Sequence, residues 1–346
     1  MQRLPVIASL LALIASPATA AHERQAPRHE VAAIEIDDVD QHHLAPKPWT
    51  SLDALDGPER FQFLVVTDRT GGAREGVFAD AAEKIDLLQP AFVMSVGDFI
   101  QGYTDDEQTL HAQWNAFDTI VDGIDAPFFY TPGNHDWQNE AMAKVWTERL
   151  GKSFYHFRYK DTLFLVLNSE LFDRRDAPWW RYEWTQLFAD EQAEQLAYLE
   201  RVLATHDDVR WTFVFVHKPY WRPRWAHPPK GEESPQTGPW PQHDYVPPEW
   251  VQVEEMLENR DYTIFAGHLH TYEFDGSDSD ASHTHDKIAL ATTGGVSSLR
   301  GVEYGEFDHM VWVTMTRDGP VIANLLQQGI LPKAFPMPKQ RPYWVD

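Results

Sequence analysis

Short apolar runs alternate with segments of helical periodicity along most of this chain of 346 residues. The runs are rich in β-branched and aromatic side chains, which is typical of buried strands. The predicted strands cover residues 61–66, 92–96, 128–131, 163–167, 211–216 and 264–265, and the predicted helices lie near residues 76–88, 106–121, 189–203 and 250–259. Such alternation favours stacked βαβ-like units, and therefore an α/β fold, over an all-β fold or a helix bundle.

The pattern changes near the end of the chain. Residues 287–293, 310–316 and 321–326 read as strands, and no clear helix lies between them. Strands that follow one another without a crossover helix pair antiparallel. We therefore expect antiparallel pairing at one edge of the fold.

Five of the apolar runs are followed by a residue that can bind a metal ion. These residues are Asp68, Asp98, Asn134, His217 and His268. In open α/β sheets ligands bind at the carboxyl ends of the strands, so these side chains are expected to meet at one edge. Oxygen and imidazole ligands together suit one or two divalent metal ions. The pattern therefore predicts a hydrolase that uses a metal-activated water.

The segments around these residues form a series of short motifs. In chain order they are Asp68-Arg69-Thr70, Gly97-Asp98, Gly133-Asn134-His135-Asp136, a single His217 and Gly267-His268-Leu269-His270. This series resembles that of the calcineurin-like metallophosphoesterases, whose motifs read D-x-H, G-D, G-N-H-[DE], H and G-H-x-H. The resemblance covers roughly residues 61–300. It implies an α/β fold of two stacked mixed β-sheets flanked by helices, a four-layer sandwich with the metals at the strand carboxyl ends.

By this resemblance, six residues would bind two adjacent divalent ions. They are Asp68, Asp98, Asn134, His217, His268 and His270. Asp98 would bridge both ions. Asn134, His217 and His268 would complete one site, and Asp68 with His270 would serve the other. Such ligands leave the metal open among Mn, Fe, Zn, Co and Ni.

The same resemblance implies catalytic roles near the metals. His135 would stay unligated and act as the general acid, or as a positive group that stabilises the leaving oxygen. Asp136 would orient the His135 ring. Asn134 and Asp136 could instead be turn formers of the kind that is common at strand ends.

One motif departs from the family pattern, since Thr70 stands where many members have the histidine of D-x-H. A threonine hydroxyl is a poor ligand for a divalent transition metal, so the site of Asp68 and His270 is expected to be the weaker one. The neighbouring Arg69 could hold a substrate phosphate through its guanidinium fork, or form a surface ion pair.

The first residues of the chain read as a signal peptide over residues 1–20. Arg3 precedes an apolar stretch, and Ala18-Thr19-Ala20 forms an A-x-A cleavage site. This pattern predicts a periplasmic or secreted protein that is cleaved after Ala20 and has no membrane span in its mature form. An uncleaved membrane anchor is the alternative.

The remaining chain divides into three predicted parts. Residues 21–60 read as an extended leader, residues 61–330 as the metallophosphoesterase domain, and residues 331–346 as a Pro-rich tail. Long loops rich in Trp and Pro interrupt the domain at residues 172–184 and 218–248. Loops of this length are interpreted as lids or binding loops, with ordered surface flaps as the alternative.

Composition narrows the classes of partner and chemistry. The chain has 53 acidic and 29 basic residues, with a formal charge of −24, which argues against nucleic acid as a partner. It contains no cysteine, so disulfides, thiolate metal sites and a cysteine nucleophile are excluded. The sequence does not determine the oligomeric state.

These observations predict an exported metal-dependent phosphoesterase that acts on a small phosphate mono- or diester. A metal-bound hydroxide would attack phosphorus directly. One alternative is a catalytically impaired binding or scaffold protein of the same fold, which only Thr70 supports. The other is a metal-dependent hydrolase of a non-phosphate ester, which would need the same metal centre.

Overall fold

The structure is a computed structural model that describes residues 57, 59–172, 186–222, 246–277 and 281–330. The predicted signal peptide, the C-terminal tail, and most of the leader and of the two long loops lie outside these residues. The described body belongs to one compact unit that begins at Glu59.

The first sheet of the body has the strand order β11-β10-β1-β2-β3. Strands β1, β2 and β3 run parallel, whereas β10 pairs antiparallel with both β1 and β11. Two crossover connections therefore build its parallel half, and a hairpin builds the other half. The strands are β1 (Phe61–Val66), β2 (Val93–Ser95), β3 (Phe128–Phe129), β10 (His309–Thr316) and β11 (Gly319–Leu326).

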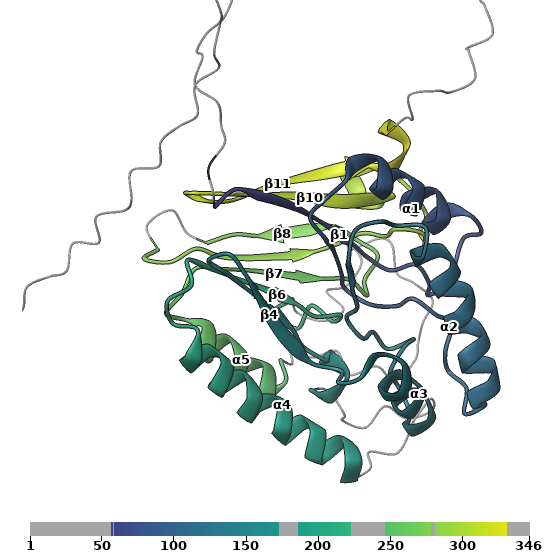
Figure 1. Cartoon of the computed structure of the whole chain (residues 1–346), viewed down its shortest axis with the longest axis horizontal. Coiled ribbons are helices and arrows are strands. Elements are labelled where there is room, and N and C mark those ends of the chain that lie inside the picture. The colour runs from purple at the N-terminus through teal and green to yellow at the C-terminus, as the bar shows by residue number, and fades with distance from the viewer. Residues whose placement is uncertain (1–56, 58, 173–185, 223–245, 278–280, 331–346) are drawn as a thin grey trace, which may run out of the picture. The chain divides into compact units, whose positions relative to one another are not determined.

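The second sheet has the order β4-β5-β6-β7-β9-β8 and lies against the first (Figure 1). Its four central strands are parallel, and β4 and β8 pair antiparallel at its two edges. The strands are β4 (Tyr155–Tyr159), β5 (Thr162–Val166), β6 (Trp211–Phe215), β7 (Tyr262–Ala266), β8 (Glu273–Asp275) and β9 (His285–Ala289).

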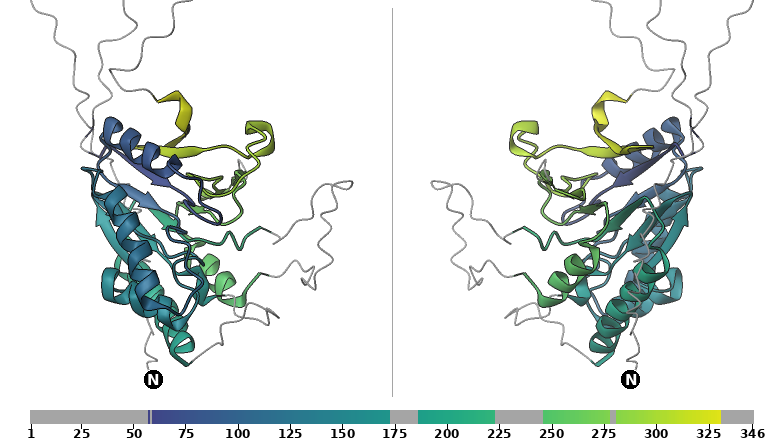
Figure 2. Two further views of the ribbon diagram at one scale, coloured as in Figure 1. Left: turned by 90° about the vertical axis from the view of Figure 1, so that its right-hand side faces the viewer. Right: turned by 90° about the vertical axis from the view of Figure 1, so that its left-hand side faces the viewer.

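Helices cover the outer faces of both sheets (Figures 1 and 2). Side chains of the first three helices pack against the first sheet, and those of the last two pack against the second, except that Phe188 of the fourth helix joins the core of the first. The helices are α1 (Val77–Leu88), α2 (Glu107–Val121), α3 (Glu140–Leu150), α4 (Gln186–Thr205) and α5 (Pro248–Leu257). Single 3-10 turns lie at Ser169–Leu171, Val302–Tyr304 and Gln327–Gly329. The fold is thus a four-layer sandwich of two mixed sheets flanked by helices, and the predicted fold class is confirmed.

Alternation along the strands divides the apolar residues among three cores. In β1, Phe63 and Val65 face the second sheet, whereas Leu64 and Val66 face α1 and α2. Successive strand side chains point to opposite faces, so a strand covered on both sides needs apolar residues at every position. This requirement explains why the predicted strands appear in the sequence as continuous apolar runs.

Several elements differ from the sequence-based expectation. Only the first part of the run at residues 287–293 is a strand, β9, which lies parallel to β7 in the second sheet and does not join β10 and β11. Only β10 and β11 form the expected antiparallel edge. Helix α3 and strands β4 and β8 were not predicted. Within the described residues, no helix is long and apolar enough to span a membrane.

Candidate metal centre

The predicted ligands follow five strands of the two sheets. Asp68 follows β1, Asp98 follows β2 and Asn134 follows β3, all in the first sheet. His217 follows β6, and His268 and His270 follow β7, in the second sheet. The structure brings these residues together at the carboxyl ends of the strands, across the boundary between the sheets.

Three side chains meet around one nitrogen, Nε2 of His217. This atom lies 2.9 Å from Oδ1 of Asn134, 3.1 Å from Nδ1 of His268 and 3.2 Å from Oδ2 of Asp98. Asp98, His217 and His268 also form a group whose ligand atoms lie within 4.8 Å of one another. Oxygen and imidazole donors converging on one point are a suitable ligand set for a divalent transition metal.

Hydrogen bonding supports this interpretation over a purely structural cluster. His217 is fully buried, and its Nδ1 lies 2.8 Å from the carbonyl oxygen of Val96, so Nδ1 carries a proton and donates it to that carbonyl. That bond leaves Nε2 facing Asp98, Asn134 and His268, where it can carry a second proton or bind a cation. A single proton on Nε2 cannot satisfy three neighbouring acceptors, whereas a divalent cation can accept lone pairs from all four groups.

The charges of the cluster agree with a site for a cation. Burial would lower the pKa of His217, but the Asp98 carboxylate raises it to about 10. Burial would raise the pKa of Asp98, but His217 and His135 hold it well below its usual range. The carboxylate therefore stays ionised and attracts positive charge, which either a proton or a metal ion can supply.

A second, smaller pair lies beside this cluster. Nε2 of His270 is 3.1 Å from Oδ1 of Asp68, and Nδ1 of His270 donates to the carbonyl oxygen of Val296 at 2.6 Å. The Asp68 carboxylate also accepts the backbone N–H of His268 at 2.9 Å and the hydroxyl of Thr67 at 2.6 Å. The Asp68–His270 pair is therefore linked to the cluster around His217 through the backbone N–H of His268.

Thr70 does not add a ligand to this pair. Its side chain is buried, and its hydroxyl donates to Oε1 of Gln101 at 3.1 Å. The Asp68–His270 pair therefore has two strong donors among the described residues, compared with four in the cluster around His217. This difference agrees with the expectation of a weaker second site.

The side chain of Arg69 points toward α2, one of the helices that cover the first sheet. Its guanidinium donates to the carbonyl oxygen of Phe99 and lies over the ring of Phe117 on α2, 5.6 Å from the centroid. Burial lowers its pKa, although the charge of Asp136 opposes that effect. These contacts show Arg69 packed beside α2, and its expected contact with a substrate phosphate stays a prediction.

His135 lies beside the cluster and is held at two points. Its backbone N–H donates to Oδ1 of Asp98 at 2.9 Å, and Nδ1 of its ring lies 2.7 Å from the carbonyl oxygen of Gln101. The Nδ1 proton is therefore used in the bond to Gln101, and Nε2 remains to exchange a proton with another group. The ring is only partly buried.

Asp136 makes contacts other than the one predicted for it. Its carboxylate accepts backbone N–H groups of Asp98, Phe99, Ile100 and Gly133 at 2.7–3.2 Å. Burial and the charge of Asp98 raise its pKa to about 8, against the opposing effect of these N–H donors. The expected bond to the His135 ring is made by Gln101 instead, so Asp136 fixes the backbone that carries Asp98.

Two motif glycines are required by close approach to the carboxylates. A Cβ atom at Gly133 would collide with Oδ1 of Asp98, and one at Gly267 would collide with Oδ2 of Asp68. A larger residue at either position would push a carboxylate out of place. The G-N-H-D and G-H-x-H motifs therefore begin with glycine because the ligand side chains occupy that space.

Sequence reasoning missed two residues of the loop between β2 and α2. The carbonyl and amide of Gln101 contact His135 and Thr70, and the side chain of Tyr103 contacts Asn134 and His135. No motif marks these positions. Their place in the site depends on the path of the loop, and only their closeness to Gly97-Asp98 in the sequence could have suggested them.

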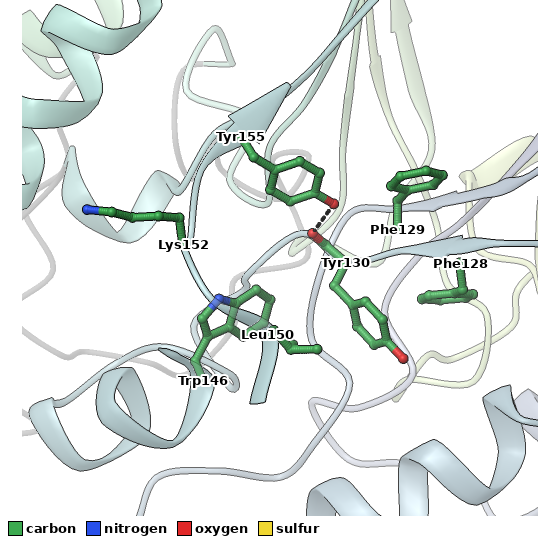
Figure 3. A pocket seen from close by; sticks show the side chains of 7 residues that line it. All are labelled: Phe128, Phe129, Tyr130, Trp146, Leu150, Lys152 and Tyr155. Atoms are coloured by element: carbon green, nitrogen blue, oxygen red, sulfur yellow. Dashed lines mark hydrogen bonds between the residues drawn. The ribbon is translucent and has the colours of Figure 1, made fainter. Parts of the chain in front are cut away.

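A cavity of about 190 Å³ lies elsewhere, between β3, β4 and the end of α3 (Figure 3). It is lined by Phe128, Phe129, Tyr130, Trp146, Leu150, Lys152 and Tyr155. Two of these residues are joined by a 2.8 Å hydrogen bond from the Tyr155 hydroxyl to the Tyr130 carbonyl (Figure 3). None of its lining residues belongs to the metal cluster.

Comparison with known proteins identifies the family. The profile of the calcineurin-like phosphoesterases matches residues 61–272, which is more than half of the chain. The chain therefore belongs to the calcineurin-like phosphoesterase family. No curated protein matches the sequence significantly.

Solved structures share the fold at low sequence identity. A dimetal phosphatase from Danio rerio is 16% identical with a TM-score of 0.53, over 77% of this chain and 96% of that chain. GAP50, the anchor in the inner membrane complex of Plasmodium, is 12% identical with a TM-score of 0.53, over 79% and 86%. Purple acid phosphatase PPD1 from yellow lupin seeds is 14% identical with a TM-score of 0.50, over 79% and 52%.

Proposed function

We propose that this protein is an exported metal-dependent phosphoesterase that hydrolyses a small phosphate mono- or diester. One observation carries the proposal: Asp98, Asn134, His217 and His268 approach one point from the ends of four strands, with His135 held beside them. A structural cluster would have no reason to place an additional imidazole there with one nitrogen left to exchange a proton. Membership of the phosphoesterase family supports the same reaction class.

The ligands divide between two metal positions in this proposal. Asp98, Asn134, His217 and His268 would hold one divalent ion, Asp68 and His270 would hold the second, and Asp98 would be shared. When bound, such ions lower the pKa of a coordinated water toward neutrality and neutralise charge on the phosphoryl oxygens. Mn, Fe, Zn, Co and Ni all suit the ligand set.

His135 is the residue assigned to proton transfer. Its Nδ1 is committed to the Gln101 carbonyl, so the proton for the leaving oxygen would come from Nε2. Nε2 faces the backbone of Gly71, which lies in the same loop as Asp68. A Cβ added at Gly71 would lie 3.8 Å from Nε2. The backbone bond to Asp98 keeps this imidazole at a fixed place relative to the ligands.

Hydrolysis of para-nitrophenyl phosphate and of bis-para-nitrophenyl phosphate with added Mn²⁺ tests the proposal. His135→Ala should keep most of the bound metal and lose roughly 10²–10⁴-fold in turnover, the usual contribution of a positioned acid. His283→Ala, which changes a histidine outside the cluster, should behave as the wild type. Equal metal loss in His135→Ala and His217→Ala would mean that His135 is a ligand.

The same assays separate the two alternatives. A scaffold protein of this fold would bind metal weakly or not at all and would hydrolyse neither ester. A hydrolase of non-phosphate esters would bind Mn²⁺ and cleave para-nitrophenyl acetate in preference to both phosphate esters. Hydrolysis of either phosphate ester that depends on Asp98 and His135 would contradict both alternatives.

A further inference from the structure

Tyr103 contacts two residues of the site at once. Its hydroxyl oxygen lies 2.6 Å from Nδ2 of Asn134 and accepts that N–H. Its ring meets the His135 ring edge-on, with centroids 4.6 Å apart and planes inclined by 77°. The side chain is 40% exposed, so it stands at the surface of the site rather than in the core.

The backbone of this loop is specialised for that placement. Gly102 and Tyr103 both have positive φ, 57° and 52°. A Cβ at Gly102 would collide with the carbonyl oxygen of His135, so only glycine fits at the position before Tyr103. A tyrosine with positive φ is strained and persists only where surrounding contacts hold it. Here those contacts include the bond from the Gly102 N–H to Oε1 of Gln113, at 2.8 Å.

The bond to Asn134 has a direct consequence for ligand chemistry. An asparagine amide presents an oxygen at one end and an NH₂ group at the other, and only the oxygen can bind a cation. The Tyr103 hydroxyl accepts the NH₂ end, which leaves Oδ1 facing Nε2 of His217 at 2.9 Å. Without that acceptor, the NH₂ end loses its partner and the amide is free to turn.

We propose that Tyr103 is a positioning residue that orients the Asn134 amide through its hydroxyl and the His135 ring through its aromatic edge. The inference rests on the proposed function for the role of His135. It assigns two separable effects to one side chain: the hydroxyl strengthens metal binding, and the ring keeps the proton donor in place.

Two substitutions separate these effects. Tyr103→Phe keeps the ring and the backbone strain but removes the hydroxyl, so its affinity for Mn²⁺ should fall about tenfold or more, the usual effect of disturbing a group that orients a ligand. Its turnover at saturating Mn²⁺ should stay close to that of the wild type. Tyr103→Leu removes the ring as well, so it should also lose about tenfold or more in kcat at saturating Mn²⁺, with little change in KM.

Calorimetric titration of the metal-free protein with Mn²⁺ measures the first effect without using activity. Tyr304→Phe, at an exposed tyrosine on the Val302–Tyr304 turn, is the matched control and should leave the affinity unchanged. In an Asn134→Asp background the loss caused by Tyr103→Phe should shrink, because a carboxylate has no NH₂ end to orient. A general structural defect would persist in that background.

Each outcome is decisive for one part of the inference. Wild-type Mn²⁺ affinity in Tyr103→Phe would overturn the role of the hydroxyl, and a wild-type kcat in Tyr103→Leu would overturn the role of the ring. Mn²⁺ binding without hydrolysis of either phosphate ester in the unmodified protein would contradict the proposed function and the role of the ring, while the titration still decides the role of the hydroxyl. Thermal unfolding of each variant identifies a substitution that only weakens the fold.

Discussion

At the scale of single residues, three predicted ligands have an unfavourable backbone conformation. Asp98, His268 and His270 have φ values of 63°, 71° and 52°, in the left-handed region. Each such residue costs of order 1–3 kcal/mol and persists where the surrounding structure determines it. The hydrogen bonds that the backbone N–H groups of Asp98 and Phe99 donate to the Asp136 carboxylate are one such constraint. The fold therefore holds the ligands in place before a metal arrives.

This conformation makes Asp98→Asn a specific test of charge. Asparagine tolerates positive φ and can still accept the His135 N–H, so the backbone should keep its shape. The variant loses the one carboxylate shared by both proposed ions, so bound metal and turnover should both collapse. Elemental analysis and ester hydrolysis measure the two effects. Wild-type metal content and rate in Asp98→Asn would disprove the shared-carboxylate assignment.

Thr70 leads to a second prediction for a single position. The Asp68–His270 pair has fewer donors than the cluster around His217, so two ions should dissociate at different concentrations, with the Asp68 side emptying first. Thr70→His should raise the metal affinity of the weaker site about tenfold or more, if the new imidazole displaces the Gln101 side chain that contacts Thr70. Thr70→Val is the control and should leave both affinities unchanged. Two equal, tight sites in the unmodified protein, measured by calorimetric titration, would contradict this reasoning.

At the scale of elements, the first residue of β10 links three segments of the body. His309 is fully buried, its Nδ1 lies 2.9 Å from Oδ1 of Asn324 on β11, and its Nε2 accepts the N–H of Ala291 at 3.0 Å. One ring nitrogen donates and the other accepts, so the ring must be neutral. Burial lowers its pKa to about 4, against the weaker raising effects of Asn324 and Asp308.

The consequence is a loss of stability in mild acid. The folded state binds the His309 proton less readily than the unfolded chain, whose histidine pKa is about 6.5. The contribution of the neutral His309 ring to the free energy of unfolding is therefore complete above about pH 6.5. It decreases as the pH falls toward 4, and about 2 kcal/mol of it is lost at pH 5. His309→Gln can still accept the Ala291 N–H. Between pH 7.5 and pH 5 its free energy of unfolding, measured with urea, should fall less than that of the wild type by this amount. His111→Gln, at a partly exposed position on α2, should keep the wild-type dependence. Equal pH dependence in all three proteins would contradict the prediction.

The elements that the sequence predicts are those covered on both faces. β5 and β6 are buried at every position, and this leaves continuous apolar runs that are easy to recognise. β8 is a short edge strand whose three residues are all exposed, and β4 is half-exposed, so neither leaves such a run. Helix α3 had a usable signal, because Asn139 caps its first turn and Met142, Ala143, Val145 and Trp146 follow at helical spacing.

Some residues of the site could be predicted from sequence motifs, whereas others depend on the path of a loop. Residues directly after buried strands could be predicted to meet, since the carboxyl ends of those strands lie at one edge. The contacts of Arg69, Asp136 and Tyr103 could not, because they depend on positive φ values and on the path of the loop between β2 and α2. For Arg69 the sequence suggested a phosphate contact, and its packing over the ring of Phe117 could not be foreseen from charge and residue type.

At the scale of the whole body, the proposed centre joins the two sheets. Asp68, Asp98 and Asn134 come from the first sheet, and the histidine ligands come from the second. Metal binding should therefore stabilise the sandwich as a unit, by about 2.7 kcal/mol when the free metal exceeds its Kd a hundredfold. The thermal midpoint should rise on adding Mn²⁺ to chelator-treated protein, and the rise should vanish in His217→Ala. An equal rise in that variant would place the stabilising metal elsewhere.

Export is the proposal that concerns the whole chain. The apolar stretch after Arg3 and the Ala18-Thr19-Ala20 site have the pattern that signal peptidases recognise. The body described by the structure belongs to a unit that begins at Glu59, so removing residues 1–20 should leave its three cores and the metal cluster intact. When the full chain is expressed in a bacterium with a general secretion pathway, the exported fraction should begin at Ala21. Ala20→Arg should block this processing, because the site requires a small residue. Protein that retains Met1 and stays in the cytoplasm in both cases would refute export, and an uncleaved chain in the membrane fraction would favour the anchor.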